Sequence, residues 1–242
     1  GNTTASFNTA MGSEALTTNT TGANNTGIGY QALTRNTTAA NNSALGYRSL
    51  TANTTGTNNT AIGSTAGTGN TSGSANTAVG TLSMNANTTG GNNTAMGYEA
   101  LRNASSVEFS VAIGSGALRN FNNTNANTAR NTAVGYQSMI GTTTGSYNTA
   151  LGYQSLDANT TGNLNTAVGY AAMPSSTTGG NNTAMGYASL QNNTTGNNNV
   201  AIGNASMIEN TTGFTNVAIG SGSLYGNTTG YLNVAIGPRS LA

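Results

Sequence analysis

A phrase of seventeen residues repeats along the chain, and this period limits what the chain can fold into. The most constant element of the phrase is a glycine that follows a small residue and an aliphatic one, as in "TAMG" and "VAIG". These anchor glycines are Gly12, Gly29, Gly46, Gly63, Gly80, Gly97, Gly114, Gly135, Gly152, Gly169, Gly186, Gly203, Gly220 and Gly237. Twelve of the thirteen spacings are 17 residues, and the spacing from Gly114 to Gly135 is 21. A fixed period near 20 residues is typical of a solenoid, in which each coil stacks on the previous one.

The residue types within one period indicate that each coil is made of strand and turn. Seventeen residues rich in Gly, Asn and Thr are too few and too rich in glycine for a helical hairpin. The sequence therefore predicts an all-β fold, a parallel β-solenoid (β-roll) of fourteen 17-residue coils. Residues 1–242 form one repeat array with a four-residue insertion between Gly114 and Gly135. The chain holds a whole number of coils, as expected for a segment of a longer fibre.

Period-two alternation around the anchor glycine predicts which side chains face inward. The residue before each anchor is aliphatic in every coil, as in Ile62 or Met96, and we expect it in the core together with the Thr or Val two residues earlier. Leu or Met four residues after the anchor is expected to supply a second strand with its core residue. The Ala between the two inward positions, such as Ala167, then faces outward. Because this position is almost always Ala, we expect another chain to pack closely against it, which predicts an oligomer.

The phrase N-T-T-G and a recurrent Asn mark the turns. The glycine of N-T-T-G stands seven residues before the next anchor, and we expect it to adopt a positive φ. Asn stands four residues before the anchor in thirteen coils, where stacked side chains can form a hydrogen-bonded ladder.

Several copies resemble a known repeat. The strings "SVAIGSGAL" (110–118), "NVAIGNASM" (199–207), "NVAIGSGSL" (216–224) and "NVAIGPRSL" (233–241) resemble the head repeat of trimeric autotransporter adhesins, the YadA-like β-roll. The fuller phrase N-T-A-I-G-Y-x-A-L-x-x-N-T-T-G is similar to repeats of trimeric phage tail fibres and related bacterial surface proteins. The resemblance covers the whole chain, although the coils here are longer than those of the adhesins. It implies a left-handed roll that forms a homotrimer, with Val and Ile of V-A-I-G inside each roll.

The residue types argue against catalysis and point to a structural role. The chain has five carboxylates, six Lys and Arg residues together, no His and no Cys, and its net charge is +1. Nucleophile–base pairs and metal-ligand clusters cannot be assembled from such a set at recognised spacings, so we expect no enzyme activity, no cofactor and no metal. The small net charge offers no surface for nucleic acid, and no apolar run is long enough to insert in a membrane.

The expected function is a structural or adhesive rod segment of a trimeric extracellular fibre. Its setting is a virion tail fibre or a bacterial cell surface, where it serves as a spacer in host attachment and contacts surface carbohydrate. The alternatives are an ice-binding solenoid, since regular Thr pairs can order water, and a fibre-borne polysaccharide depolymerase.

Candidate surface-contact residues fall in two groups. Tyr follows the anchor in seven coils, and the run Tyr136, Tyr153, Tyr170 and Tyr187 is unbroken, so these rings form either a carbohydrate-contact ladder or a packed seam between coils or chains. Arg119, Phe121 and Arg130 lie around the insertion, which is either a receptor-contacting loop or a tolerated insertion. The N-T-T sequons, among them Asn53 and Asn159, are either glycosylation acceptors or turns.

Overall fold

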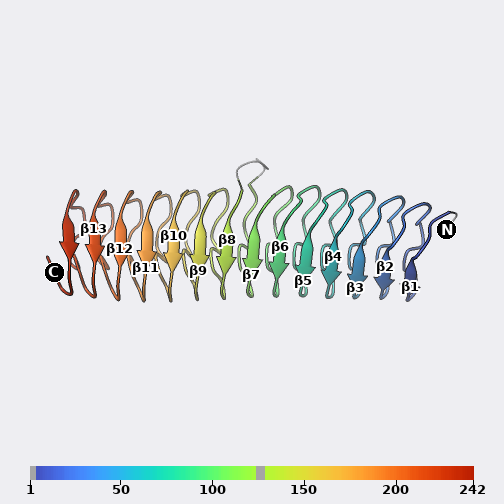
Figure 1. Cartoon of the computed structure of the whole chain (residues 1–242), viewed down its shortest axis with the longest axis horizontal. Coiled ribbons are helices and arrows are strands. Elements are labelled where there is room, and N and C mark those ends of the chain that lie inside the picture. Colours follow the sequence, from blue (N-terminus) through green and yellow to red (C-terminus); the bar gives the residue numbers. More distant parts are fainter. Residues whose placement is uncertain (1–3, 124–128) are drawn as a thin grey trace. The chain divides into compact units, whose positions relative to one another are not determined.

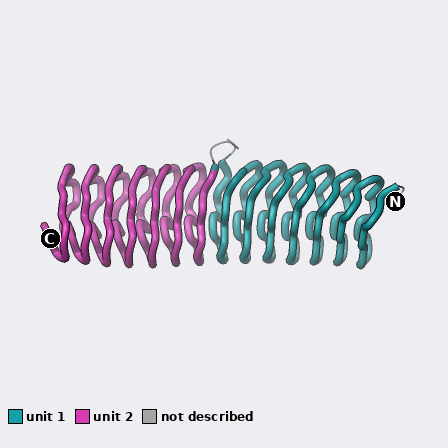
Figure 2. Tube along the Cα trace, viewed as in Figure 1, with its two compact units in different colours: residues 1–129 teal, residues 130–242 magenta. Residues whose placement is uncertain are grey.

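The computed structural model describes residues 4–123 and 129–242. The chain forms two compact units, residues 1–129 and residues 130–242 (Figure 2). All the regular elements among the described residues are strands.

Each unit is a stack of coils that contribute one short strand apiece to a parallel sheet (Figure 1). The strands of unit 1 are β1 (Thr9–Met11), β2 (Thr26–Ile28), β3 (Ser43–Leu45), β4 (Thr60–Ile62), β5 (Thr77–Val79), β6 (Thr94–Met96) and β7 (Val111–Ile113). Those of unit 2 are β8 (Thr132–Val134), β9 (Thr149–Leu151), β10 (Thr166–Val168), β11 (Thr183–Met185), β12 (Val200–Ile202), β13 (Val217–Ile219) and β14 (Val234–Ile236). Strands pair in sequence order, and equivalent residues lie opposite each other, as in Ala61 and Ala78. The predicted parallel β-solenoid with 17-residue coils is confirmed.

Hydrogen bonds between consecutive coils hold the backbone along each stack. The Thr26 N–H donates to the Asn42 carbonyl at 2.8 Å, and the Gly46 N–H donates to the Ile28 carbonyl at 2.8 Å. Because consecutive coils within each unit repeat this pattern, the backbone polar groups are satisfied by stacking despite the low apolar content.

The strand residues face the opposite way from the sequence prediction. In β6 the central Ala95 is fully buried, whereas Met96 is 42% exposed. The same holds for β10, where Ala167 is buried and the flanking Thr166 and Val168 are half-buried. The aliphatic residue before each anchor therefore lies on the outer face, and the prediction that it fills the core is wrong.

The narrow interior of the coil explains this orientation. Leu or Met four residues after the anchor is buried, as for Leu33 and Met84, which confirms it as a core residue. In one coil Gly67 takes the place of the core Leu or Met. A Cβ added at Gly67 would lie 3.8 Å from the Ala61 Cβ, so the Ala of the strand packs directly against the core Leu or Met position. Two large side chains cannot face each other across so short a distance, and the strand therefore presents Ala inward.

The segment after the anchor is a turn instead of the second strand that the sequence predicted. Gln31 and Leu33 have φ values of 55° and 52°, and the same two positions have positive φ in the other coils. Alternating left-handed residues curl the backbone and direct the Leu inward. The Ala or Ser before this Leu, as at Ala32 and Ser49, is also buried.

Two ladders of buried Asn side chains complete the interior. In the first ladder, four residues before the anchor, the Asn25 Oδ1 accepts the Asn42 N–H at 3.0 Å. The Asn42 Nδ2 then donates to the Gly56 carbonyl at 2.9 Å. The predicted Asn ladder at this position is confirmed.

The second ladder, which we call the inner amide ladder, consists of the first residue of each N-T-T-G. Asn36 Nδ2 donates to Asn19 Oδ1 at 2.9 Å and to the Ala39 carbonyl at 2.9 Å. The inner amide ladder thus ties each turn both to itself and to the previous coil.

The glycine of N-T-T-G gives the backbone room in ten coils, although Ala39 and Val107 stand at the same position in two others. Its φ is not among the positive values, so the prediction of a left-handed residue at this position is wrong. A Cβ at Gly56 would overlap the carbonyl of Gly73 in the next coil and the side chain of Asn53. Glycine therefore permits close approach of the inner amide ladder to the backbone.

Candidate functional site

The outer face of each sheet carries a column of aliphatic side chains, one per coil. In unit 1 this aliphatic column consists of Met11, Ile28, Leu45, Ile62, Val79, Met96 and Ile113, and in unit 2 of Val134, Leu151, Val168, Met185, Ile202, Ile219 and Ile236. Nine of them are between 37% and 69% exposed, and the other five are half-buried. Exposed apolar residues that occupy consecutive strands form a continuous patch, which is typical of an interaction surface.

The residues beside the aliphatic column are also uncharged. Thr or Ser stands two residues earlier on the same outer face in ten coils, and Val stands there at Val111, Val200, Val217 and Val234. The outer face is therefore wholly apolar across β12, β13 and β14. The alternation of residues along the strand separates its two faces in the sequence. The prediction placed the aliphatic face inside and the Ala face outside, and the structure shows the reverse.

The four predicted tyrosines of unit 2 form a stack, which we call the Tyr row. Ring centroids are 5.3 Å apart between Tyr136 and Tyr153, 5.0 Å between Tyr153 and Tyr170, and 5.4 Å between Tyr170 and Tyr187. The ring planes differ by 4° to 15°. The side chains remain 41% to 56% exposed. The 17-residue period places one ring per coil, and the coil spacing brings them to stacking distance.

Unit 1 has a shorter version of the same feature. Tyr30 and Tyr47 stack at 5.5 Å, and the stack stops there because Ser64 and Thr81 occupy the equivalent position of the next two coils.

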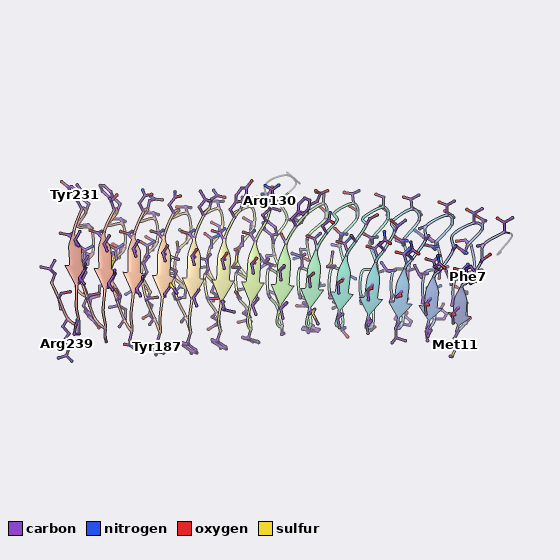
Figure 3. The ribbon with its side chains drawn as sticks, in the orientation of Figure 1. Phe7, Met11, Arg130, Tyr187, Tyr231 and Arg239 are labelled. Carbon is purple, nitrogen blue, oxygen red and sulfur yellow. The ribbon has the colours of Figure 1, made fainter. Side chains whose placement is uncertain are left out.

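A second aromatic stack, which the sequence prediction missed, lies elsewhere on unit 2. Phe214 and Tyr231 stack at 5.0 Å with planes only 2° apart, and both stand six residues before an anchor glycine. Figure 3 places Tyr231 and Tyr187 on opposite sides of unit 2. The equal offset from the anchor was the signal that could have found this pair.

The stacked arrangement limits what the Tyr row can contact. Each interior ring has both faces covered by its neighbours, so the edges and hydroxyl groups make up the exposed surface. Sugars pack on aromatic residues through the ring face. In this row only the two terminal rings, Tyr136 and Tyr187, have a face that no other tyrosine of the row covers. The geometry therefore favours the packed seam between coils over a carbohydrate-contact ladder.

The predicted residues around the insertion have different environments. Phe121 is fully buried, so it cannot contact a receptor at the surface, contrary to the prediction. Arg119 lies 3.2 Å from the buried carboxylate of Glu99, which also binds Arg102 at 2.6 Å. This three-residue cluster links two consecutive coils.

Arg130 lies at the start of unit 2 and contacts an aromatic residue of the next coil. Its Nη1 donates to the Tyr147 hydroxyl at 3.2 Å, and its guanidinium carbon lies 5.7 Å from the centre of the Tyr147 ring. The insertion itself includes residues 124–128, which lie outside the described residues.

The N-T-T sequons at Asn53 and Asn159 are closed to glycosylation in the folded chain. Asn53 is fully buried, and its Nδ2 donates to the Asn36 Oδ1 and to the Gly56 carbonyl, both at 2.9 Å. Asn159 is likewise buried with its amide bonded to Gly162. The side chain that would accept the sugar is thus part of the inner amide ladder, which favours the turn interpretation.

The ionisable groups of the described residues form no metal centre. No group of three or more His, Cys, Asp or Glu side chains is placed to hold a metal ion in the part of the chain that the structure describes. Partial burial raises the pKa of the Asp157 carboxyl above its ordinary value, because the charged form loses contact with water. Within the same described ranges, no helix is long and apolar enough to cross a membrane.

Comparison of the chain with protein-family models, with curated proteins and with solved structures finds no match. What the chain does must therefore be inferred from the surfaces described above.

Proposed function

We propose that the chain is a structural rod segment of a trimeric extracellular fibre, and that the aliphatic column is the surface through which the chains associate. The observation that carries this proposal is the continuous exposure of the column on consecutive strands of both units. When the column packs against the same column of a sister chain, the burial of apolar surface stabilises the assembly by about 25 cal/mol per Å².

The uniform coil supports a structural role. Each unit repeats the same hydrogen bonds and the same buried residues from coil to coil. Such an array gives a rigid, extendable segment whose outer faces can carry contacts to a host surface. The three-fold assembly and the extracellular setting, on a virion tail fibre or a bacterial surface, follow from the resemblance of the V-A-I-G phrases to fibre repeats.

The test is the mass of the purified chain by light scattering. We expect a trimer of the 24.0 kDa chain. The double variant Val168→Lys with Met185→Lys places two charges in the aliphatic column of adjacent coils, and we expect a folded monomer because burying unpaired charge opposes association.

A matched control carries the same two charges elsewhere on the same unit. Thr161 and Thr178 are exposed in adjacent coils, and Thr161→Lys with Thr178→Lys should leave a trimer. A wild-type monomer, or a trimer that survives charges in the column, would exclude the aliphatic column as the association surface.

A second candidate, binding to ice, rests on the second Thr of N-T-T-G. The first Thr, as at Thr54, donates its hydroxyl to the Thr71 carbonyl of the next coil at 3.0 Å. The second, as at Thr55, is exposed, and no hydrogen bond of its side chain occurs within the described residues. A column of such hydroxyls could order water, and appreciable thermal hysteresis of the purified chain would favour this function over a purely structural one.

A further inference from the structure

The Tyr row offers ring edges instead of ring faces, and this sets the chemistry that it can bind. Four nearly parallel rings, Tyr136, Tyr153, Tyr170 and Tyr187, follow one another at 5.0 to 5.4 Å. Because the rings cover each other's faces, their exposed edges and hydroxyl groups form a continuous strip along the direction in which the coils stack.

We propose that the Tyr row binds elongated, flat, conjugated aromatic molecules that lie across the ring edges along the stacking direction. The edge of an aromatic ring is electropositive and its face electronegative, so edge-to-face contact is favourable. One flat ligand lying on the row makes this contact with several tyrosines at once. A compact aromatic molecule would reach only one or two of them.

The backbone fixes the row before any ligand arrives. Consecutive coils of unit 2 are held by bonds such as Gly169 N–H to the Leu151 carbonyl at 2.8 Å and Gly186 N–H to the Val168 carbonyl at 2.8 Å. The donors of these bonds are the anchor glycines, which directly precede Tyr170 and Tyr187 in the chain. Binding to such a rigid row loses little conformational freedom, which favours affinity.

The residues that follow each tyrosine leave the row accessible to an uncharged or weakly charged ligand. They are Gln137, Gln154, Ala171 and Ala188. Gln154 Nε2 donates to Gln137 Oε1 at 3.1 Å, so these two amides are engaged with each other. The two alanines are small. The residues that follow the tyrosines thus carry no charge, and beside Tyr170 and Tyr187 they are also small.

The experiment uses the whole chain and the dye thioflavin T, an elongated flat aromatic probe whose fluorescence rises when it is immobilised. Binding is measured by equilibrium dialysis and by fluorescence, on protein whose mass has been checked by light scattering. We expect saturable binding at one site per chain for the wild type.

The loss-of-binding variant is Tyr153→Ser with Tyr170→Ser, which removes the two interior rings. Serine already stands at this position in other coils, at Ser13, Ser64, Ser115 and Ser221, so the fold is expected to remain. We expect at least a tenfold loss of affinity. The control, Tyr30→Ser with Tyr47→Ser, removes two rings from unit 1 and should leave the binding unchanged.

A gain-of-binding variant tests the row length directly. Ser64→Tyr with Thr81→Tyr joins Tyr30 and Tyr47 to Tyr98 in an unbroken row of unit 1, and we expect the amount of bound dye to double. No binding by the wild type, full binding after loss of Tyr153 and Tyr170, or no gain in the extended variant would each overturn the proposal. None of these outcomes depends on the trimer, whose mass is measured separately.

Discussion

The two units are built from the same type of coil, but they differ in the columns of side chains that run along them. Unit 1 has the longer inner amide ladder, and unit 2 has the longer stack of tyrosines. In unit 1 the inner amide ladder runs through Asn19, Asn36, Asn53, Asn70 and Asn87, with Nδ2 to Oδ1 distances of 2.8 to 2.9 Å. It ends there because Ala104 stands at the next position, and among the described residues Asn87 Oδ1 has no hydrogen-bond partner. The stacked tyrosines outside stop after two rings. In unit 2 the Tyr row is unbroken over four coils. The inner amide ladder of unit 2 is interrupted at Ser176, and within the part of the chain that the structure describes, the buried Asn159 Oδ1 and Ser176 Oγ have no hydrogen-bond partner.

This difference shows that the inside and the outside of the coil vary independently. The backbone geometry is the same above and below Ser176, as the register of β10 with β11 shows. A gap in the inner amide ladder therefore costs free energy without changing the fold, and the surface can gain or lose tyrosines without affecting the core.

The largest effect is expected from a charge placed on the inner side of a strand. Ala167→Lys puts an ammonium group into a fully buried position, and we expect a loss of at least about 3 kcal/mol in the free energy of unfolding. Circular dichroism should show an unfolded or partly unfolded unit. Its neighbour Val168→Lys should retain the folded spectrum, and equal spectra for both variants would mean that the two faces are not distinct.

The next largest effect is expected from opening a gap in the inner amide ladder of unit 1 and from filling the gap in that of unit 2. Asn53→Ser in unit 1 should cost about 1 to 3 kcal/mol because it leaves a buried amide oxygen of Asn36 without its donor. Ser176→Asn in unit 2 should stabilise by about 1 to 2 kcal/mol, since it supplies the missing donor to Asn159. Denaturant unfolding of both variants measures these changes, and a destabilised Ser176→Asn would contradict the ladder account.

A smaller gain is expected from filling a cavity of unit 1. Gly67 replaces the core Leu or Met of its coil, and a small cavity lined by Leu50, Ala61 and Met84 lies there. Its φ of 58° is close to the 48° of Leu50 and the 47° of Met84, so a Leu fits this backbone. Gly67→Leu should stabilise by about 1 kcal/mol.

The control for this cavity is a glycine with open surroundings. A Cβ at Gly226 would meet no atom within 4 Å. Gly226→Ala should change the melting temperature much less than Gly67→Leu, and a similar shift for both variants would point to an effect on the unfolded chain instead of the cavity.

The smallest effect concerns pH. Burial raises the pKa of Asp157 in the folded chain, so folding favours the protonated form. The stabilising contribution is present below the unfolded pKa and is lost as the pH rises through the folded pKa. We therefore expect Asp157→Asn to flatten the pH dependence of the melting temperature in the range just above the ordinary pKa of an Asp carboxyl, and to raise the melting temperature slightly at neutral pH. A steeper dependence would contradict the assignment.

Much of the architecture could be predicted from the repeat. The anchor glycines set the coil length, and the Asn four residues before each anchor indicated a ladder because a side chain repeated at coil spacing can bond to itself. The Tyr row was predicted in the same way, since Tyr136, Tyr153, Tyr170 and Tyr187 recur without a gap. Phe121 was misplaced because a single aromatic residue in a non-repeating segment has no copies with which to compare it.

By itself the sequence determined the period, the solenoid and which residues share a column, because stacking identical coils places identical residues on top of each other. Only the tertiary structure decided which columns lie inside. Alternation along Thr166–Val168 defines two faces of a strand but does not say which face is buried. That choice depends on the space left by the opposite wall of the coil, where Leu156 and its equivalents already fill the interior. With room for only a methyl group, the strand turns Ala inward and leaves its larger aliphatic side chains on the surface.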